Sequence, residues 1–392
     1  MKENQKQAVM GLLTAAVNDM VPSRSLVENL GEEDFLEIYR FAKKQDLVHL
    51  IGYALRQCED LPLGETKAKF DKAVYVSVFR QQKFENALVL LRKIFNDNRI
   101  PFIPLKGTVL RKFYPYPWMR TSCDIDLLVR QEDLDKALNA CKTSAECSDF
   151  VNGSHDVGFV LGQGVHVEIH FSLIEEGRIN EAEKMLFSVW EHATALPGSY
   201  EYVLTDEMFY YYHLAHTAKH VEGGGCGVRP FLDLYVLNRF LPDNREKRNN
   251  LLEKGGLSRF AAPAESLCGY WFEGKNADKI TLALEKYIFE AGLYGDLEHY
   301  VAVKNIQKKG KLSYFVYRVF MPYSHLVLLY PHLKGRKYLT PFYQIRRWLK
   351  LLRPKTLERS VIELKKNTGL QEEKVKEIKE LFEQIGITTD EK

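Results

Sequence analysis

Two aspartates, Asp124 and Asp126, stand two positions apart inside the apolar run DIDLLV. Such a run is typical of a buried strand, and strand alternation turns both carboxylates to the same face. Two like charges held side by side repel each other unless a cation lies between them. Carboxylate ligands with no cysteine among them favour Mg²⁺ or Mn²⁺ over zinc. The pair therefore predicts a divalent metal site.

A third carboxylate stands in a second strand-like run, VHVEIHF at 165–171. Alternation places His166, Glu168 and His170 on one face of that strand. If the two strands are neighbours, three carboxylates can hold two metal ions about 3.5 to 4 Å apart, the arrangement that serves phosphoryl transfer. Glu168 would also accept the proton of an attacking hydroxyl. The alternatives are solvated acids on an exposed sheet, or a zinc hydrolase built on the two histidines and Glu168.

The segment PLKGTVLRKFY, upstream of the aspartates, predicts a strand, a glycine turn and a helix that begins near Thr108. Helix N-terminal N–H groups attract anions, and Lys106 adds a positive charge suited to phosphate. Gly107 allows close approach of the backbone, and the Thr108 hydroxyl could cap the helix or contact a phosphate. Arg120 could clamp a phosphate or form a surface salt bridge. Plain turn and cap chemistry is the alternative for the glycine and the threonine.

The elements that must position these residues lie in one central segment. Residues 99–200 contain short apolar runs typical of strands, whereas residues 1–98 and 201–392 show the spacing of amphipathic helices. Within the core we expect strands near 100–107 and 123–130, a helix over 131–141 and a strand hairpin that turns at Gln163 and Gly164. Strands confined between helical flanks favour an α+β fold, in which a small mixed-sheet core lies between a helical N-terminal region and a helical C-terminal domain.

Composition excludes several classes of protein. The 392 residues are 45% hydrophobic and 27% charged, with a net charge of +3, so the whole chain demands neither a nucleic acid nor a membrane as partner. The first twenty residues lack the apolar stretch of a secretory leader, and no run approaches the length of a membrane span. The six cysteines show no metal-binding or disulfide spacing. We expect a cytoplasmic protein with reduced thiols.

Taken in order, several short motifs resemble a known family. They are Leu105-Lys106-Gly107, Tyr114-Pro115, Arg120, DIDLLV at 124–129 and Glu168-Ile169-His170. This order resembles the nucleotidyltransferase superfamily of the polymerase beta type, and within it a bacterial group of poorly characterised nucleotidyltransferases. The chain departs from the usual pattern in its phosphate loop, where Gly107 is followed by Thr108 rather than by serine or glycine. Each motif is weak alone, and their joint order carries the signal.

The resemblance implies transfer of a nucleoside monophosphate from an NTP, with ATP as the expected donor, to a hydroxyl acceptor with release of pyrophosphate. It implies Mg²⁺ on Asp124, Asp126 and Glu168. Nucleotide contacts would come from Lys106, Gly107, Thr108, Arg120, His170, His220 and Arg229. His220 and Arg229 flank a glycine loop able to bind anions. For Arg229 the alternative is an i, i+4 pair with Asp233 on one helix.

A basic and aromatic segment at 334–359 holds nine lysines and arginines and one acid. It could grip RNA or an anionic surface, or be the solvated face of a helix. Residues 356–387 predict a pair of charged amphipathic helices. The acceptor is not determined by these motifs and could be RNA, a protein side chain or a small hydroxyl compound. The competing function is a catalytically inactive module that senses nucleotides or binds protein or RNA.

Overall fold

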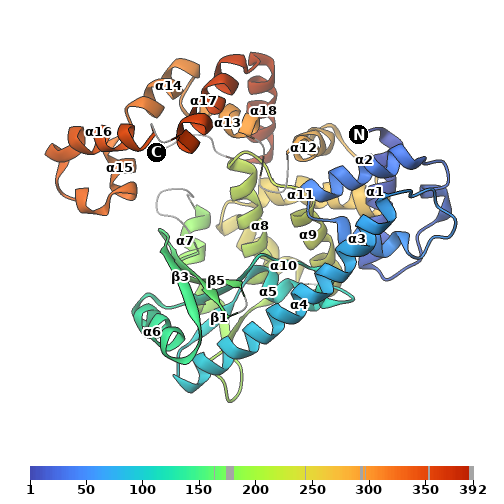
Figure 1. Ribbon diagram of the computed structural model, residues 1–392, viewed down its shortest axis with the longest axis horizontal. Helices are drawn as coiled ribbons and strands as arrows, with labels where there is room; N and C mark the ends of the chain where they lie inside the picture. Colours follow the sequence, from blue (N-terminus) through green and yellow to red (C-terminus); the bar gives the residue numbers. More distant parts are fainter. Residues whose placement is uncertain are drawn as a thin grey trace. The chain divides into compact units, whose positions relative to one another are not determined.

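The computed structural model describes residues 1–162, 164–173, 181–242, 244–291, 295, 297–351 and 354–387 (Figure 1). The chain forms two compact units. The first comprises Met1–His216 and Val228–Thr281, and the second comprises Thr217–Gly227 and Leu282–Lys392. The division of the sequence into segments 1–98, 99–200 and 201–392 stays a prediction.

A five-stranded mixed sheet lies in the first unit. Its strands are β1 (Phe102–Pro104), β2 (Asp124–Val129), β3 (Cys147–Asn152), β4 (Asp156–Leu161) and β5 (Val165–His170). They follow the order β1-β2-β5-β4-β3. The pair β2–β5 is parallel, and the other neighbours are antiparallel. The sheet and its helical surroundings confirm the expected α+β fold, and the hairpin of β4 and β5 is also confirmed, although Gln163 at its turn lies outside the described residues.

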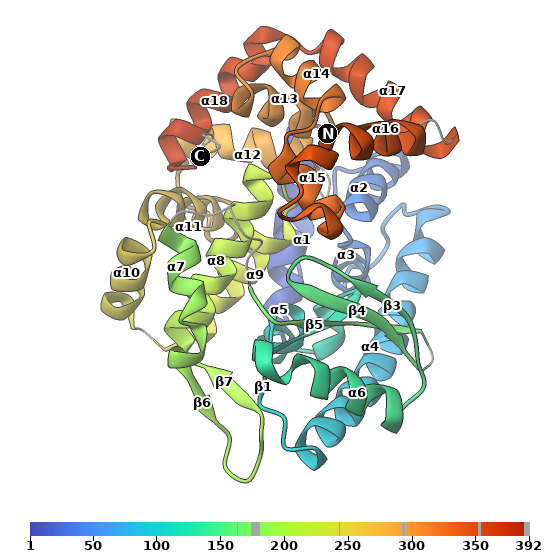
Figure 2. The same ribbon diagram turned by 90° about the vertical axis from the view of Figure 1, so that its left-hand side faces the viewer.

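Alternation along the strands divides the sheet into an apolar face and a polar face. Ile125 and Leu127 of β2, with Val167 and Ile169 of β5, are fully buried in one core cluster. That cluster is completed by α4 (Thr66–Asp97) and α6 (Leu134–Ser144), which cover the same side of the sheet (Figure 2). Because neighbouring side chains point to opposite faces, Asp124, Asp126 and Glu168 are turned to the other side.

The remaining helices of the first unit surround this core. They are α1 (Glu3–Val17), α2 (Glu32–Lys44), α3 (Val48–Leu55), α5 (Lys106–Leu110), α7 (Glu181–Phe187), most of α8 (Asp206–Glu222), α9 (Arg229–Phe240), α10 (Arg245–Lys254) and α11 (Ser258–Glu273). In α4, Leu88, Leu91 and Phe95 recur at helical spacing and bury one face against the sheet. The second half of this 32-residue helix is therefore packed along one face against the core of the sheet.

Three local expectations were incomplete or wrong. β3 was not expected, because CSDFVN is polar and its burial alternates little. The hairpin of β6 (Ala193–Ala195) and β7 (Tyr202–Leu204) was not expected either, since each strand has only three residues. The helix after β1 begins at Lys106 rather than near Thr108, and it is only five residues long. Its first residue therefore lies two positions closer to the strand than expected.

The second unit is helical. Besides the end of α8 it contains most of α12 (Lys279–Glu290), α13 (Leu297–Gln307), α14 (Lys311–Val319), α15 (Tyr323–Leu329), α16 (Thr340–Leu351), α17 (Pro354–Gly369) and α18 (Glu372–Ile385). α17 and α18 confirm the helix pair expected at the C-terminus. Within the described part of the chain, no helix has both the length and the apolar character required to cross a membrane.

The basic segment 334–359 runs through α16 and into α17 of the second unit. Arg347 is buried and donates to the carbonyl oxygens of Val319 and Arg318, and the Trp348 indole donates to Val319 at 2.8 Å. Tyr338 is 77% exposed. Part of the segment therefore packs within its own unit and part faces solvent, and binding of nucleic acid or an anionic surface stays a prediction.

Candidate active site

The three predicted carboxylates come together on the polar face of the sheet. Parallel pairing sets Asp126 opposite Glu168 and Asp124 opposite His166. His170 is the last residue of β5, and its Nε2 lies 2.9 Å from Asp126 Oδ1 and 3.5 Å from Glu168 Oε2. Asp126, Glu168 and His170 each offer one ligating atom, and these atoms lie within 4.8 Å of one another. Residues 44 positions apart in sequence thus form one cluster.

Charge is unevenly distributed in this cluster. Asp126 is buried, and its Oδ1 accepts hydrogen bonds from Lys106 Nζ at 2.8 Å and from His170. Burial by itself would raise the pKa of Asp126, but the Lys106 ammonium and the His170 ring outweigh burial and lower it. For Asp124, burial together with the charges of Asp126 and Glu168 raises the pKa to about 6. Asp126 therefore stays ionised to a lower pH than a free aspartate, whereas Asp124 takes up a proton more readily.

The donor set fits a hard divalent cation. Three carboxylates outnumber the Lys106 ammonium that pairs with Asp126, and the pKa of Asp124 is raised by burial and then by the charges of Asp126 and Glu168. A dication among oxygen ligands relieves such repulsion. In the same arrangement, the Lys106 ammonium contacts a carboxylate oxygen of Asp126 and does not lie at a separate phosphate-binding position. Phosphate contact by Lys106 stays a prediction and requires the ammonium to leave Asp126.

Tyr212 of α8 is a site residue that the sequence interpretation missed. Its side chain is buried, and burial raises the pKa of the phenol. The charges of Lys106, Asp126 and Glu168 also act on this pKa, so the phenol lies within electrostatic range of the cluster. A tyrosine in the run YYYH has no spacing signal that separates it from its neighbours, and only the fold selects it.

The turn between β1 and α5 is held by close packing. Lys106 adopts a left-handed φ of 44°, and a Cβ on Gly107 would lie 2.9 Å from Ser122 Cβ. Arg111 is buried and donates to Gly107 O at 2.9 Å and to Ser122 Oγ at 2.7 Å. Gly107 is therefore required by the approach of the Ser122 segment. Arg111 was not predicted as a site residue, although it fixes the position of this turn.

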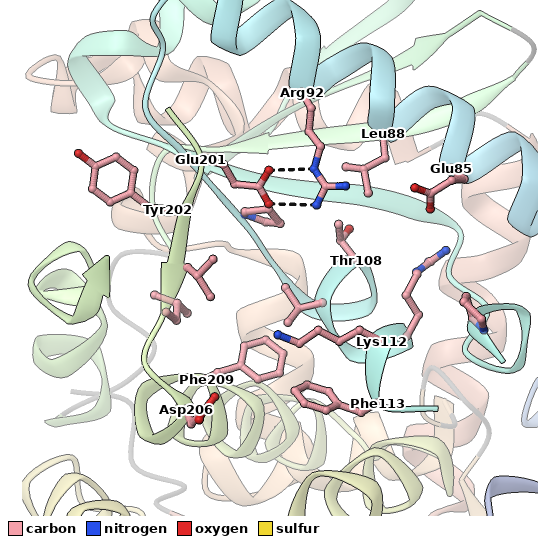
Figure 3. Close-up of a pocket in the computed structure, with 16 residues that line it drawn as sticks. Glu85, Leu88, Arg92, Thr108, Lys112, Phe113, Glu201, Tyr202, Asp206 and Phe209 are labelled. Atoms are coloured by element: carbon pink, nitrogen blue, oxygen red, sulfur yellow. Dashed lines mark hydrogen bonds and ion pairs between the residues drawn. The ribbon is translucent and has the colours of Figure 1, made fainter. Parts of the chain in front are cut away.

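Thr108 lies on the side of α5 that faces a cavity of about 260 Å³. The cavity is lined by residues of α4, α5, β7 and the start of α8, and Figure 3 shows Thr108 among them. On the wall of the cavity, Arg92 and Glu201 form a bidentate ion pair, with Nε at 2.8 Å from Oε2 and Nη2 at 3.0 Å from Oε1. The Thr108 Oγ1 atom is buried and has no hydrogen-bond partner among the described residues. The Thr108 hydroxyl therefore does not cap α5, and its contact with a phosphate stays a prediction.

Arg120 forms a buried ion pair rather than the surface salt bridge considered as an alternative. Its Nε lies 2.7 and 3.0 Å from the two carboxylate oxygens of Asp233 on α9. The Tyr114 hydroxyl donates to the same carboxylate at 2.7 Å. The surface alternative was wrong because α9 packs against the segment before β2, which sequence spacing does not reveal.

Arg229 does not pair with Asp233, although both lie on α9. Its guanidinium instead contacts the Asp46 carboxylate and backbone oxygen and the Thr121 hydroxyl. The alternative of an i, i+4 pair was therefore wrong, because each residue finds a partner from a distant segment. Both arginines, 120 and 229, anchor the segment that leads into β2, and their contact with a nucleotide stays a prediction.

The histidines of α8 differ in their placement. His213 is buried and its Nε2 lies 2.8 Å from the Pro230 carbonyl oxygen. His220 is in the last turn of α8 and belongs to the second unit, so its role in nucleotide binding stays a prediction.

His166 of β5 is exposed and belongs to neither of the two clusters of potential metal ligands found in the described ranges. The zinc hydrolase built on His166 thus gains no support.

Three carboxylates from adjacent parallel strands, beside a lysine on a tight turn, have the chemistry of the metal-binding sites that serve phosphoryl transfer. A family described as uncharacterised nucleotidyltransferase matches residues 31–273. The chain belongs to this family of nucleotidyltransferases, and the family implies a nucleotide substrate. The match includes the whole sheet and ends before residue 282, where the second unit resumes. Neither the curated proteins nor the solved structures that were searched gave a match.

Proposed function

We propose that the protein transfers a nucleoside monophosphate from an NTP to a hydroxyl acceptor, with the help of Mg²⁺ or Mn²⁺. The observation that carries the proposal is the parallel register that sets Asp126 opposite Glu168, with Asp124 on the same face. Asp124, Asp126 and Glu168 would hold the metal, which supplies positive charge to the phosphates when bound. Family membership supports the transfer of a nucleotidyl group.

The chain's own residues take the remaining roles. The acceptor oxygen forms a bond to the α-phosphorus, the bond from that phosphorus to the oxygen shared with the β-phosphate breaks, and pyrophosphate leaves. The side chain of Glu168 is 37% exposed and can accept the proton lost by the acceptor hydroxyl. Lys106 supplies a positive charge that moves from Asp126 to the phosphates, and the buried phenol of Tyr212 on α8 lies within electrostatic range of the same cluster.

A transfer assay tests the proposal. Purified protein is incubated with each α-labelled NTP, ATP first, with Mg²⁺ and with separate pools of RNA, protein and small metabolites. We expect label on one pool and pyrophosphate in equal amount. Asp126→Asn should abolish both, because it removes a metal ligand while it keeps the shape of the side chain.

Asp135→Asn is the matched control, since Asp135 is an exposed carboxylate on α6, which covers the opposite face of the sheet. It should retain full activity, and circular dichroism should show that both variants are folded. Turnover retained in Asp126→Asn refutes the assignment of the site. Saturable NTP binding without label on any pool refutes transfer and supports a nucleotide-sensing module.

A further inference from the structure

A second group of potential metal ligands borders the carboxylates. His155, Asp156 and His170 each offer one ligating atom, and these atoms lie within 4.8 Å of one another. Antiparallel pairing sets Asp156 opposite His170, and the backbone N–H of Phe171 donates to His155 O at 3.0 Å. The β4–β5 hairpin therefore holds the three side chains together by its backbone.

His170 has a buried nitrogen that lacks a partner. Its Nε2 lies 2.9 Å from Asp126 Oδ1, and an ionised carboxylate only accepts hydrogen bonds, so Nε2 carries the proton. In a neutral ring the lone pair is then on Nδ1. That atom is buried and makes no hydrogen bond within the described part of the chain. A buried acceptor without a partner is uncommon and calls for a ligand.

The contact with Asp126 is the one that metal-binding histidines usually make. Such a histidine donates its second ring N–H to a carboxylate, which fixes the tautomer and the orientation of the ring. Here Asp126 is the carboxylate, and the His170 ring is almost fully buried, with 4% of its side chain exposed. In the neutral ring, Nδ1 is therefore the nitrogen that can bind an ion.

The other two ligands have suitable spacing. His155 Nε2 lies 3.3 Å from Asp156 Oδ2, and two ligand atoms that each lie about 2.0 to 2.2 Å from one tetrahedral ion stand about 3.3 to 3.6 Å apart. The opposite ring nitrogen, His155 Nδ1, is 3.0 Å from Ser154 Oγ, which orients the imidazole. The His155 and His170 ring centroids are 5.6 Å apart. The side chain of His155 is 17% exposed and that of Asp156 is 20% exposed, so an ion can reach them.

We propose that His155, Asp156 and His170 form a site for a divalent transition metal of the Zn²⁺ type, separate from the site formed by the three carboxylates. Two imidazoles and one carboxylate suit zinc, whereas Mg²⁺ prefers oxygen ligands. Three protein ligands leave a position open for water or another oxygen ligand. The inference does not rest on nucleotidyl transfer, although the His170 ring joins the two sites through Asp126.

Zinc binding by the full chain provides the test. Protein without a polyhistidine tag is stripped with a chelator, and Zn²⁺ affinity is measured by competition with a chromogenic chelator. Co²⁺ serves as a spectroscopic probe, since its visible absorption reports a site with nitrogen and oxygen ligands. We expect one equivalent of Zn²⁺ that a large excess of Mg²⁺ does not displace. His155→Ala and Asp156→Asn should each weaken binding at least about tenfold.

The matched control is His166→Ala, which removes an exposed histidine from the same strand as His170 and should leave zinc affinity unchanged. Circular dichroism checks that each variant is folded. Unchanged affinity in His155→Ala and Asp156→Asn overturns the proposal, as does a protein that binds no Zn²⁺. Loss of zinc in Glu168→Gln with retention in His155→Ala overturns it as well, because the ion then lies among the carboxylates.

Discussion

Arg120 and Asp233 lie 113 residues apart and form a buried ion pair, with Arg120 Nε at 2.7 and 3.0 Å from the two carboxylate oxygens. The pair joins α9 to the segment that leads into β2, the strand of Asp124 and Asp126. Because the Asp233 carboxylate also accepts from Tyr114, it holds two side chains of that segment. The position of the candidate active site is thus fixed partly from a helix more than 100 residues downstream.

Removal of the Asp233 charge should destabilise the protein. Asp233→Asn leaves the Arg120 guanidinium buried without its counter-ion, which costs about 3 to 5 kcal/mol in the free energy of unfolding. Denaturant unfolding of the variant measures this loss, and Asp135→Asn serves as the exposed control. Unchanged stability together with weaker NTP binding would contradict an anchoring role and would place Arg120 on the nucleotide.

The charge state of Asp124 should set a pH dependence. Burial and the neighbouring carboxylates raise its pKa from 3.8 to about 6 in the folded protein, so the folded state binds this proton more tightly than the unfolded state. Its contribution to stability is therefore fully present below about pH 4 and is lost as the pH rises toward 6. Metal-dependent activity should change in the opposite sense and fall below pH 6, because a protonated carboxyl is a poor ligand.

Asp124→Asn tests both parts of this expectation. At pH 8 without metal the variant should be more stable than the parent protein by about 1 kcal/mol, since it removes one of three repelling carboxylates. Thermal unfolding at pH 4 and pH 8 gives the comparison, and the difference between the two proteins should shrink at the lower pH. An activity profile that stays flat from pH 5 to 8 would contradict the role of Asp124 as a metal ligand.

The ion pair between Lys106 and Asp126 should affect NTP and metal in different ways. Lys106→Met removes a charge expected to contact phosphate, so the KM for the NTP should rise about 10- to 100-fold, the effect of one charge-assisted hydrogen bond. Affinity for Mg²⁺ should stay the same or increase, because Asp126 Oδ1 loses a competing ammonium. Steady-state kinetics over a range of NTP and Mg²⁺ concentrations separates the two effects, and weaker Mg²⁺ binding would show that Lys106 positions Asp126 for the metal.

The unpartnered hydroxyl of Thr108 gives a prediction with two readouts. Thr108→Val replaces a buried polar atom that makes no hydrogen bond in the described ranges by a methyl group of similar size, so the free energy of unfolding should rise by about 1 kcal/mol. If the hydroxyl contacts a phosphate, NTP affinity should fall about fivefold in the same variant. Thr108→Ser keeps the hydroxyl and should restore the affinity. Equal NTP binding by all three proteins would exclude the phosphate contact.

Sequence spacing was sufficient for the local part of the site. The alternation of DIDLLV and VHVEIH placed Asp124 with Asp126 and Glu168 with His170, because the two-residue period of a strand is a property of neighbouring residues. The apolar residues between them likewise indicated the buried face. The α+β fold followed from the confinement of such runs to one segment between helical flanks.

Only the tertiary structure decided which strands are neighbours and where each charged side chain finds its partner. The parallel pairing of β2 with β5, the approach of Tyr212 and the contact of Lys106 with Asp126 depend on packing between distant segments. The same is true of Arg229, for which the alternative of an i, i+4 pair with Asp233 does not form. Spacing along a chain reports local geometry, whereas a buried charge pairs with whichever opposite charge the fold brings nearest.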